Sequence, residues 1–414
     1  MSVIALLRRE PRALAFGLMH MLAATVGQTF VISLFLPGIK ASFGLGDAEV
    51  SLLFTITTLL SAAALWKIGA RIDRADIVRY ALWCGMFVAL ACALVAAARE
   101  LVLLVVGFFC LRLAGNGLLT HVALTTTARH FTSGRGLALS LVMLGSSLGE
   151  ASLPALLVPL IGIWGWRASL VATGGFALVL VAAAAAAIRS QSEFRSPTTG
   201  APTAATARSH PIRRGPQAGS RNYFVMTVPL FVAMPMIVTA TVFHQAIVAE
   251  ANGVSLQWFA VSFIAFAVAR VASSLAIGPL ADRTGSAWLF CVHLIPLAVG
   301  TVALLVFSSQ WVVPVYWFCA GIASGMGGVL QMTVVAERIA LARLGTARSR
   351  VAAATIVASA AGPLLFGVAL AAGASVALIL WVSVALLLAA TALGFVATKG
   401  DGGGFAPAWR RSAR

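Results

Sequence analysis

Apolar positions along the chain form long runs that are separated by short polar stretches. A helix needs about 20 mostly apolar residues to cross a bilayer. The runs are uniformly apolar, as in VAAAAAAI at 181–188, whereas the strands of a membrane barrel alternate in character. Because backbone groups in lipid must pair within their own segment, the runs predict helices. The predicted spans are 13–38, 49–72, 77–98, 101–127, 136–163, 166–188, 223–250, 256–280, 286–308, 311–335, 347–372 and 375–397.

Two segments lack this apolar pattern. Residues 190–222 are rich in Pro, Ser, Thr, Gly and Arg, a composition that predicts a flexible linker. Residues 399–414 predict a polar tail. The linker and the tail leave an N-terminal six-helix bundle at 1–189 and a C-terminal six-helix bundle at 223–398. The expected fold class is therefore an all-α integral membrane protein with twelve transmembrane helices in two pseudo-symmetric bundles.

The composition agrees with a chain that faces lipid, and the placement of the charged residues predicts its topology. Of the 414 residues, 60% are hydrophobic and 10% are charged, against about 25% charged in a soluble domain. The net charge of +17 is unevenly placed. If both termini share one side, that side collects most lysines and arginines, and the other side holds Lys40, Arg99 and Arg167. Such an excess marks the cytoplasmic face. We expect an inner-membrane protein with both termini, the linker and the tail in the cytoplasm, and no nucleic-acid partner.

A charged motif occurs twice, half a chain apart. It reads GPLADRTG at 278–285 and, in a rougher copy, GARIDRAD at 69–76, where Asp76 stands in place of the last glycine. Glycines also recur as GNG at 115–117 and GMG at 325–327. A repeat of this length fits two bundles related by an axis along the membrane normal.

The two charged motifs suit a gate at the cytoplasmic side. Glycine lets helix ends approach closely, and an aspartate can pair with a helix N-terminus and a nearby cation. Such contacts would hold the halves together and break when that side opens. The alternative interpretation is a topological anchor without a gating part. The predicted gating residues here are Gly69, Asp73, Arg74, Gly278, Asp282, Arg283 and Gly285.

Polar residues inside the spans are candidates for the transport site, because a charge at the bilayer centre costs about 2.5–3.5 kcal/mol on insertion scales. Arg270 has no acidic residue within one turn on its helix and could hold a carboxylate through two parallel hydrogen bonds. The alternative is a structural ion pair with another helix. Further substrate-binding candidates, each otherwise a packing residue, are Gln28, His121, His244 and Gln245.

One more charged residue, Glu150, predicts a proton carrier, and a second, Arg112, lies close to it in the sequence of spans. Glu150 lies well inside the fifth run, where burial favours the protonated carboxyl and lets it carry a proton. Arg112 lies in the neighbouring fourth run. Either residue could instead have a purely structural role.

Enzyme motifs do not fit this chain. GSSLG at 145–149 matches the GxSxG pattern, but a nucleophile elbow needs a strand before the serine, and these glycines lie in a predicted helix as a packing face. No HExxH or P-loop pattern occurs, so we expect no enzyme activity, no cofactor and no metal. Transport would draw on ion or substrate gradients.

With its twelve spans, its long central loop and its two GxxxDRxG-like motifs, the chain resembles the major facilitator superfamily. Between residues 115 and 170, the stretches GNGLL, HFTSGRGLALSLVMLGSSLGE and GWRASL are similar to its monocarboxylate porter and oxalate/formate antiporter branches. The resemblance implies that Arg112, which starts RLAGNG, is the helix-4 arginine tied to proton movement. It implies that Arg270, in AVAR, faces a substrate carboxylate, and that Arg135 joins the gate near the substrate path.

The sequence thus favours a secondary transporter that moves a small, monocarboxylate-like organic anion by alternating access, with proton symport or exchange. Its expected partners are the substrate, protons and the lipid bilayer, and it is expected to work as a monomer. The alternative is efflux of drugs or other apolar or cationic compounds. A lesser alternative is a membrane receptor or scaffold that transports nothing.

Overall fold

The computed structural model describes residues 3–68, 72, 75–131, 134–189, 221–338 and 341–400. All regular structure in these ranges is helical. Eleven helices in them are long and apolar enough to cross a membrane. The predicted all-α membrane fold is confirmed.

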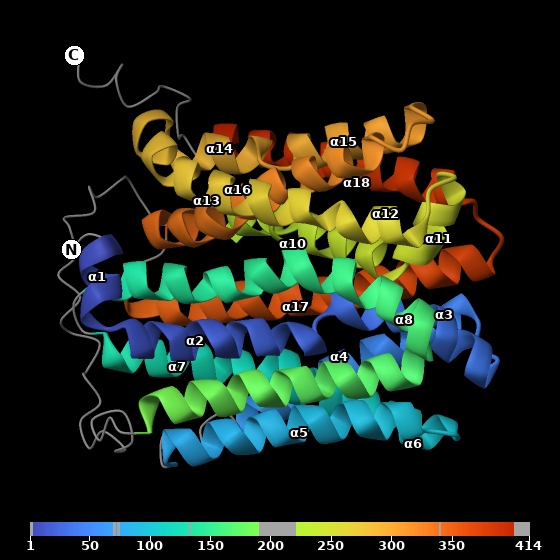
Figure 1. The fold of residues 1–414 in the computed structure, drawn as a ribbon. Helices are drawn as coiled ribbons and strands as arrows, with labels where there is room; N and C mark the ends of the chain where they lie inside the picture. Colours follow the sequence, from blue (N-terminus) through green and yellow to red (C-terminus); the bar gives the residue numbers. More distant parts are fainter. Residues whose placement is uncertain are drawn as a thin grey trace. The chain divides into compact units, whose positions relative to one another are not determined.

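One of these helices accounts for the twelfth predicted span. Helix α8, Arg135–Ile188, has 54 residues and would be roughly 80 Å long if straight, far more than a bilayer core of about 30 Å. Gly165 interrupts it with φ 76° and ψ 165°, a left-handed φ that glycine adopts without strain. The two arms fold back there (Figure 1). Helix α8 is therefore long enough to cross the membrane twice. Its two arms correspond to the predicted spans 136–163 and 166–188, and the turn at Gly165 lies between them.

The chain divides into two compact units, Met1–Thr203 and Ala204–Arg414. The described part of the first unit comprises α1 (Val3–Arg9), α2 (Pro11–Ala24), the 3₁₀ turn η1 (Thr25–Gly27), α3 (Thr29–Phe43), α4 (Asp47–Ile68), α5 (Ile77–Ala97), α6 (Leu101–Leu111), the π-helix η3 (Arg112–Leu119), α7 (Thr120–His130) and α8.

The described part of the second unit comprises α10 (Arg221–Phe243), α11 (Gln245–Ala251), α12 (Leu256–Val261), α13 (Phe263–Thr284), α14 (Ser286–Val292), α15 (Ile295–Val306), α16 (Val312–Arg338), α17 (Leu341–Ala371) and α18 (Val376–Gly400). Several helices start earlier or end later than the apolar runs predict. Helix α17 begins at Leu341 rather than 347 because Ala, Leu and Arg are good helix formers outside lipid as well. The predicted linker and tail lie almost wholly outside the described residues, so the predicted domain limits stay predictions.

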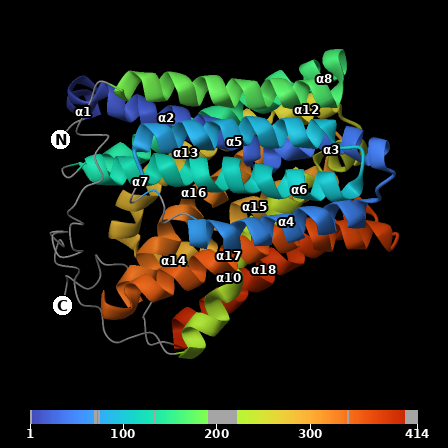
Figure 2. The same cartoon turned by 90° about the horizontal axis from the view of Figure 1, so that it is seen from below.

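Small residues set the packing inside each unit. In the first, α8 packs against α2 and α5 (Figure 1, Figure 2). A Cβ added at Gly145 would collide with the Leu18 carbonyl oxygen, and one at Gly149 would lie 2.6 Å from the Thr25 side chain. The GSSLG stretch is therefore a helix-packing face, as its sequence predicts. In the second unit, Gly362 of α17 meets the backbone of Met236 in the same way.

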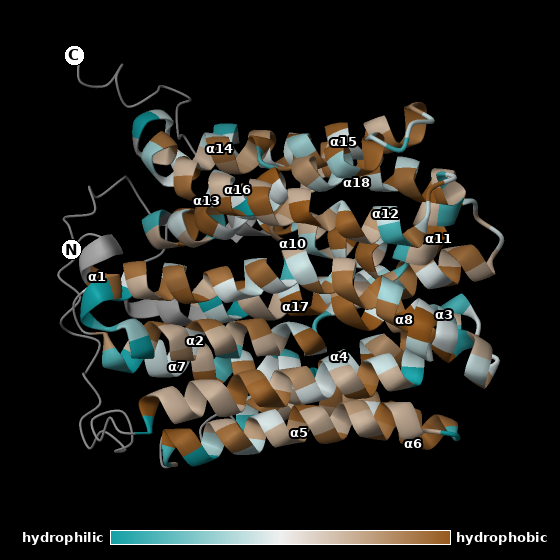
Figure 3. Cartoon of the chain, viewed as in Figure 1, coloured by the Kyte–Doolittle hydropathy of each residue, from teal (hydrophilic) through white to brown (hydrophobic). Residues whose placement is uncertain are grey.

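The surfaces of the helices suit a lipid environment. Large apolar side chains such as Trp66, Val102 and Ile163 are 84%, 73% and 74% exposed. Apolar residues line the middle of the helices, and many polar residues lie toward their ends (Figure 3). Burial in lipid rather than in protein is what stabilises these side chains.

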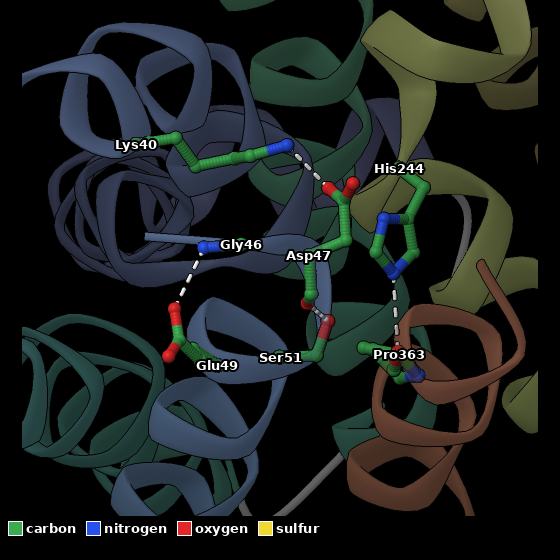
Figure 4. Close-up of polar contacts among 7 residues, drawn as sticks. All are labelled: Lys40, Gly46, Asp47, Glu49, Ser51, His244 and Pro363. Atoms are coloured by element: carbon green, nitrogen blue, oxygen red, sulfur yellow. Dashed lines mark hydrogen bonds and ion pairs between the residues drawn. The ribbon is translucent and has the colours of Figure 1, made fainter. Parts of the chain in front are cut away.

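At one such end, polar contacts order the loop between α3 and α4. Lys40 forms an ion pair with Asp47, and the Gly46 amide donates to the Glu49 carboxylate at 2.8 Å (Figure 4). Next to this loop, Trp166 fills the space beside Gly38, and Arg167 donates to the Ala96 carbonyl at 3.0 Å. The GWR signature is thus accounted for by packing around the turn at Gly165.

Candidate functional site

The first membrane span is interrupted in its middle. Helix α2 continues as the 3₁₀ turn η1, and the next residue, Gln28, has a φ of −87° and a ψ of 157°, which are extended rather than helical. Helix α3 restarts at Thr29. The extended residue interrupts the helical hydrogen-bond ladder, and backbone groups freed in this way need other partners.

Arg112 supplies such a partner. Its side chain is 6% exposed, and Nη1 donates to the Gly27 carbonyl oxygen at 2.9 Å. The guanidinium also lies 5.0 Å from the centroid of the Phe54 ring, within the range of a cation–π contact. Arg112 therefore stabilises the break directly.

The π-helix η3 begins at Arg112 and fits closely against this break. A Cβ added at Gly115 would lie 2.6 Å from Gly27 Cα, so only glycine allows the two backbones to meet. Single π-turns inside helices recur at functional sites. The GNG motif at 115–117 thus positions Arg112 against the first span.

Glu150 lies near the same break. It is 4% exposed and accepts a hydrogen bond from Ser146 Oγ at 3.3 Å, while its neighbour Gly149 packs on Thr25 of η1. The structure therefore brings the predicted residues Gln28, Arg112 and Glu150 to one place in the first unit. We call the set Thr25–Gln28, Arg112, Gly115, Gly149 and Glu150 the span-1 cluster. His121 is half-buried further along, on α7, where its Nδ1 contacts Thr125 Oγ1 at 3.4 Å.

The second unit has a break at a corresponding span. His244 separates α10 from α11 and is 3% exposed. Its Nε2 donates to the Pro363 carbonyl oxygen of α17 at 3.1 Å (Figure 4), because a carbonyl can only accept. The ring also stacks on Phe366 with centroids 4.7 Å apart. Gln245, 4% exposed, begins α11.

Arg270 lies on α13 and is half-buried. Its guanidinium carbon is 5.6 Å from the centroid of the Phe266 ring. Phe266 in turn stacks on Phe263 at 4.8 Å with an interplanar angle of 8°, and both rings meet Trp317 of α16 edge-on. These three rings form an aromatic platform that supports Arg270.

The two charged motifs differ in structure. Gly285 ends α13 with φ 97°, as the turn glycine of the second motif should, and Ser286 donates to the Glu337 carboxylate of α16. In the first motif, Asp76 replaces that glycine and instead caps α5, accepting from the Arg79 amide at 3.0 Å. Gly69, Asp73 and Arg74, and the side chain of Asp282, lie outside the described residues.

A Cβ built at Gly278 would meet no atom of the described chain within 4 Å, and the predicted close approach of another helix there stays a prediction. Gly278 precedes Pro279 inside α13, and a glycine there avoids the clash of a proline ring with a preceding Cβ. Arg283 and Arg135 are exposed at the end of α13 and the start of α8, so their gating roles stay predictions.

The sequence predicts the polar residues of the site but not the helix breaks beside which they lie. The available signal was Gly27-Gln28 and His244-Gln245, each a polar interruption of an apolar run. The π-turn at Arg112 has no comparable signal apart from its two glycines. Within the part of the chain that the structure describes, no group of three His, Cys, Asp or Glu residues could hold a metal ion.

Comparison with known proteins places this fold. A bacterial homolog of the human lysosomal transporter Spinster, solved in an inward-facing and unoccupied conformation, superposes with a TM-score of 0.69 and 16% identity over 95% of this chain and 97% of its own. The nucleoside transporter NupG gives 0.66 and 9% over 94% and 98%. No curated protein sequence matches significantly. Identity this low shows the fold alone.

The family is shown by the sequence itself. The profile of the Major Facilitator Superfamily matches residues 16–247, which is more than half of the chain. Members of this family are transporters rather than enzymes. The chain is therefore a multi-pass membrane transporter of the Major Facilitator Superfamily.

Proposed function

We propose that this protein moves a small, monocarboxylate-like organic anion across the inner membrane by alternating access, coupled to protons or to exchange. The observation that carries the proposal is Arg270 on its aromatic platform. Of the similar solved structures, NupG is a nucleoside transporter, so the argument for an anion rests on the residues of this chain.

Arg270 has the chemistry of a carboxylate receptor. A guanidinium over an aromatic face is stabilised away from bulk water, and its donor fork matches the two oxygens of a carboxylate. The half-buried position leaves part of the side chain accessible. The Phe266 ring lies against the guanidinium, and a substrate carboxylate would bind through the N–H groups of Arg270.

Arg112, which is buried in the first unit, is a weaker candidate for the substrate. Its Nη1 is already hydrogen-bonded to Gly27, and its charge lies on Phe54. Drawing it to a substrate would leave the Gly27 carbonyl unsatisfied in a buried place. We assign Arg112 to holding the span-1 cluster and, through it, to proton coupling.

Glu150 is the proposed proton carrier. It is a buried carboxyl beside the break in the first span, with a hydroxyl donor, Ser146, on one oxygen. Protonation removes a charge that is costly to hold in a buried place. Gln28, His121, His244 and Gln245 would add uncharged hydrogen bonds to the substrate, and the two charged motifs with Arg135 would form the cytoplasmic gate.

A binding experiment on the purified protein tests the role of Arg270. We expect lactate or pyruvate, but not uncharged lactamide, to raise the melting temperature of the wild-type protein. Arg270→Ala should weaken that binding about 10- to 100-fold, the range for loss of a charged hydrogen bond. Arg270→Lys should retain part of it. Arg348→Ala, at an exposed arginine of α17, is the matched control and should bind as the wild type does.

The same assay distinguishes transport of an organic anion from the alternative, efflux of apolar or cationic compounds. The rings around Trp317 would also suit a flat apolar cation, which Arg270 should repel. Stabilisation by such a cation, increased in Arg270→Ala, would favour efflux and contradict the anion assignment. Unchanged lactate binding in Arg270→Ala would remove Arg270 from the site.

A further inference from the structure

We propose that α1 and the helix ends beside it form a binding site for anionic phospholipid headgroups at the cytoplasmic end of the first unit. The site is defined by Arg8, Arg9, Arg12, Arg129 and Arg135. It shares Arg135 with the proposed cytoplasmic gate but does not depend on which substrate is transported.

The orientation of α1 is the first observation. Glu10, with φ −134° and ψ 52°, breaks the chain between α1 and α2, and α1 runs across the end of α2 (Figure 1, Figure 2). Helix α2 belongs to a membrane span. A helix lying across its end therefore follows the membrane surface, as interfacial helices do.

The faces of α1 agree with that position. Leu6 is fully buried against the unit, whereas Leu7 is 46% exposed. Arg8 and Arg9 follow it and are exposed. In the interface, Leu7 reaches the acyl chains while the arginines extend to the headgroups.

Helix packing brings further arginines to the same level. Gly17 of α2 meets both Val142 of α8 and Thr127 of α7. Helices α2 and α8 run parallel at this contact, because Gly145, three residues further on, meets Leu18 and Met21. The start of α8 at Arg135 and the end of α7 at Arg129 therefore lie beside the start of α2, where Arg12 is exposed.

Glu10 is the acid within this group, and its charge has a partner. Its carboxylate lies 3.2 Å from His130 Nε2, so it is turned toward the end of α7. Five arginines with one engaged carboxylate make a strongly positive surface at headgroup depth. A basic residue near an anionic membrane surface contributes about 1 kcal/mol, and phosphate oxygens match the guanidinium fork. Since the membrane is always present, phospholipid is the ligand we assign.

Native mass spectrometry of the full-length protein tests the site, with phosphatidylglycerol and phosphatidylcholine added as competing lipids. The wild type should retain phosphatidylglycerol preferentially. Arg8→Ala/Arg9→Ala should lower that retention roughly 30-fold, as two surface arginines predict. Arg8→Lys/Arg9→Lys keeps the charge and should restore most of it. An unchanged melting temperature of each variant confirms that it folds.

Matched variants decide whether the effect belongs to this site. Arg348→Ala/Arg350→Ala removes an equal charge from two exposed arginines of α17 and should retain phosphatidylglycerol as the wild type does. An equal loss in both double variants would contradict a site at α1. So would unchanged retention in Arg8→Ala/Arg9→Ala, or displacement of the lipid by inorganic phosphate, which would indicate a site for soluble anions.

Discussion

At the scale of residues, two of the buried polar side chains in this protein hydrogen-bond to the backbone of another helix. Arg112 donates to Gly27, and His244 donates to Pro363. Both contacts lie beside interrupted helices, where backbone groups need side-chain partners. A polar residue inside a span can therefore mark an interrupted helix, where its hydrogen-bond partner is a backbone carbonyl of this chain rather than a substrate.

Glu150 gives a prediction at this scale. Glu150→Gln keeps the oxygen that accepts from Ser146 but cannot carry a proton. We expect lactate uptake by this variant to lose its acceleration by a pH gradient, while lactate–lactate exchange in preloaded liposomes persists. The two uptake rates in proteoliposomes are the measurement. Full acceleration in the variant would assign proton coupling to another residue.

At the scale of elements, the apolar runs predicted the spans well because burial in lipid depends on local composition. The division at Gly165 and most span limits followed directly. The breaks at Gln28 and His244 and the π-turn at Arg112 did not follow. They depend on neighbouring helices, through contacts such as Gly115 on Gly27, and tertiary contacts of this kind have no local signal.

Two glycines of α8 provide a matched test of helix packing. Gly145→Ala would place a Cβ against the Leu18 carbonyl, whereas Gly162→Ala would meet nothing within 4 Å. We expect Gly145→Ala to destabilise the protein by about 1–3 kcal/mol through overpacking. Gly162→Ala should be neutral or stabilising by up to about 1 kcal/mol because alanine favours helix. Thermal unfolding in detergent measures both, and equal melting temperatures would contradict the packing described for α2 and α8.

At the scale of the whole molecule, charge placement predicts the topology. Arg99 and Arg348 are both exposed, and the predicted spans place them on opposite sides of the membrane. A membrane-impermeant maleimide should label Arg348→Cys from the cytoplasmic side and Arg99→Cys from the other side. The wild type, whose cysteines are buried or half-buried, is the background control. Labelling of both variants from one side would overturn the predicted topology.

The most direct test of the proposed function is uptake of labelled lactate into proteoliposomes that contain the purified wild-type protein. The account predicts saturable uptake that is accelerated when the outside is more acidic than the lumen, or when the lumen is preloaded with lactate. The account would be contradicted if uptake under both conditions were no faster than uptake by protein-free liposomes. The protein in that experiment must still unfold cooperatively.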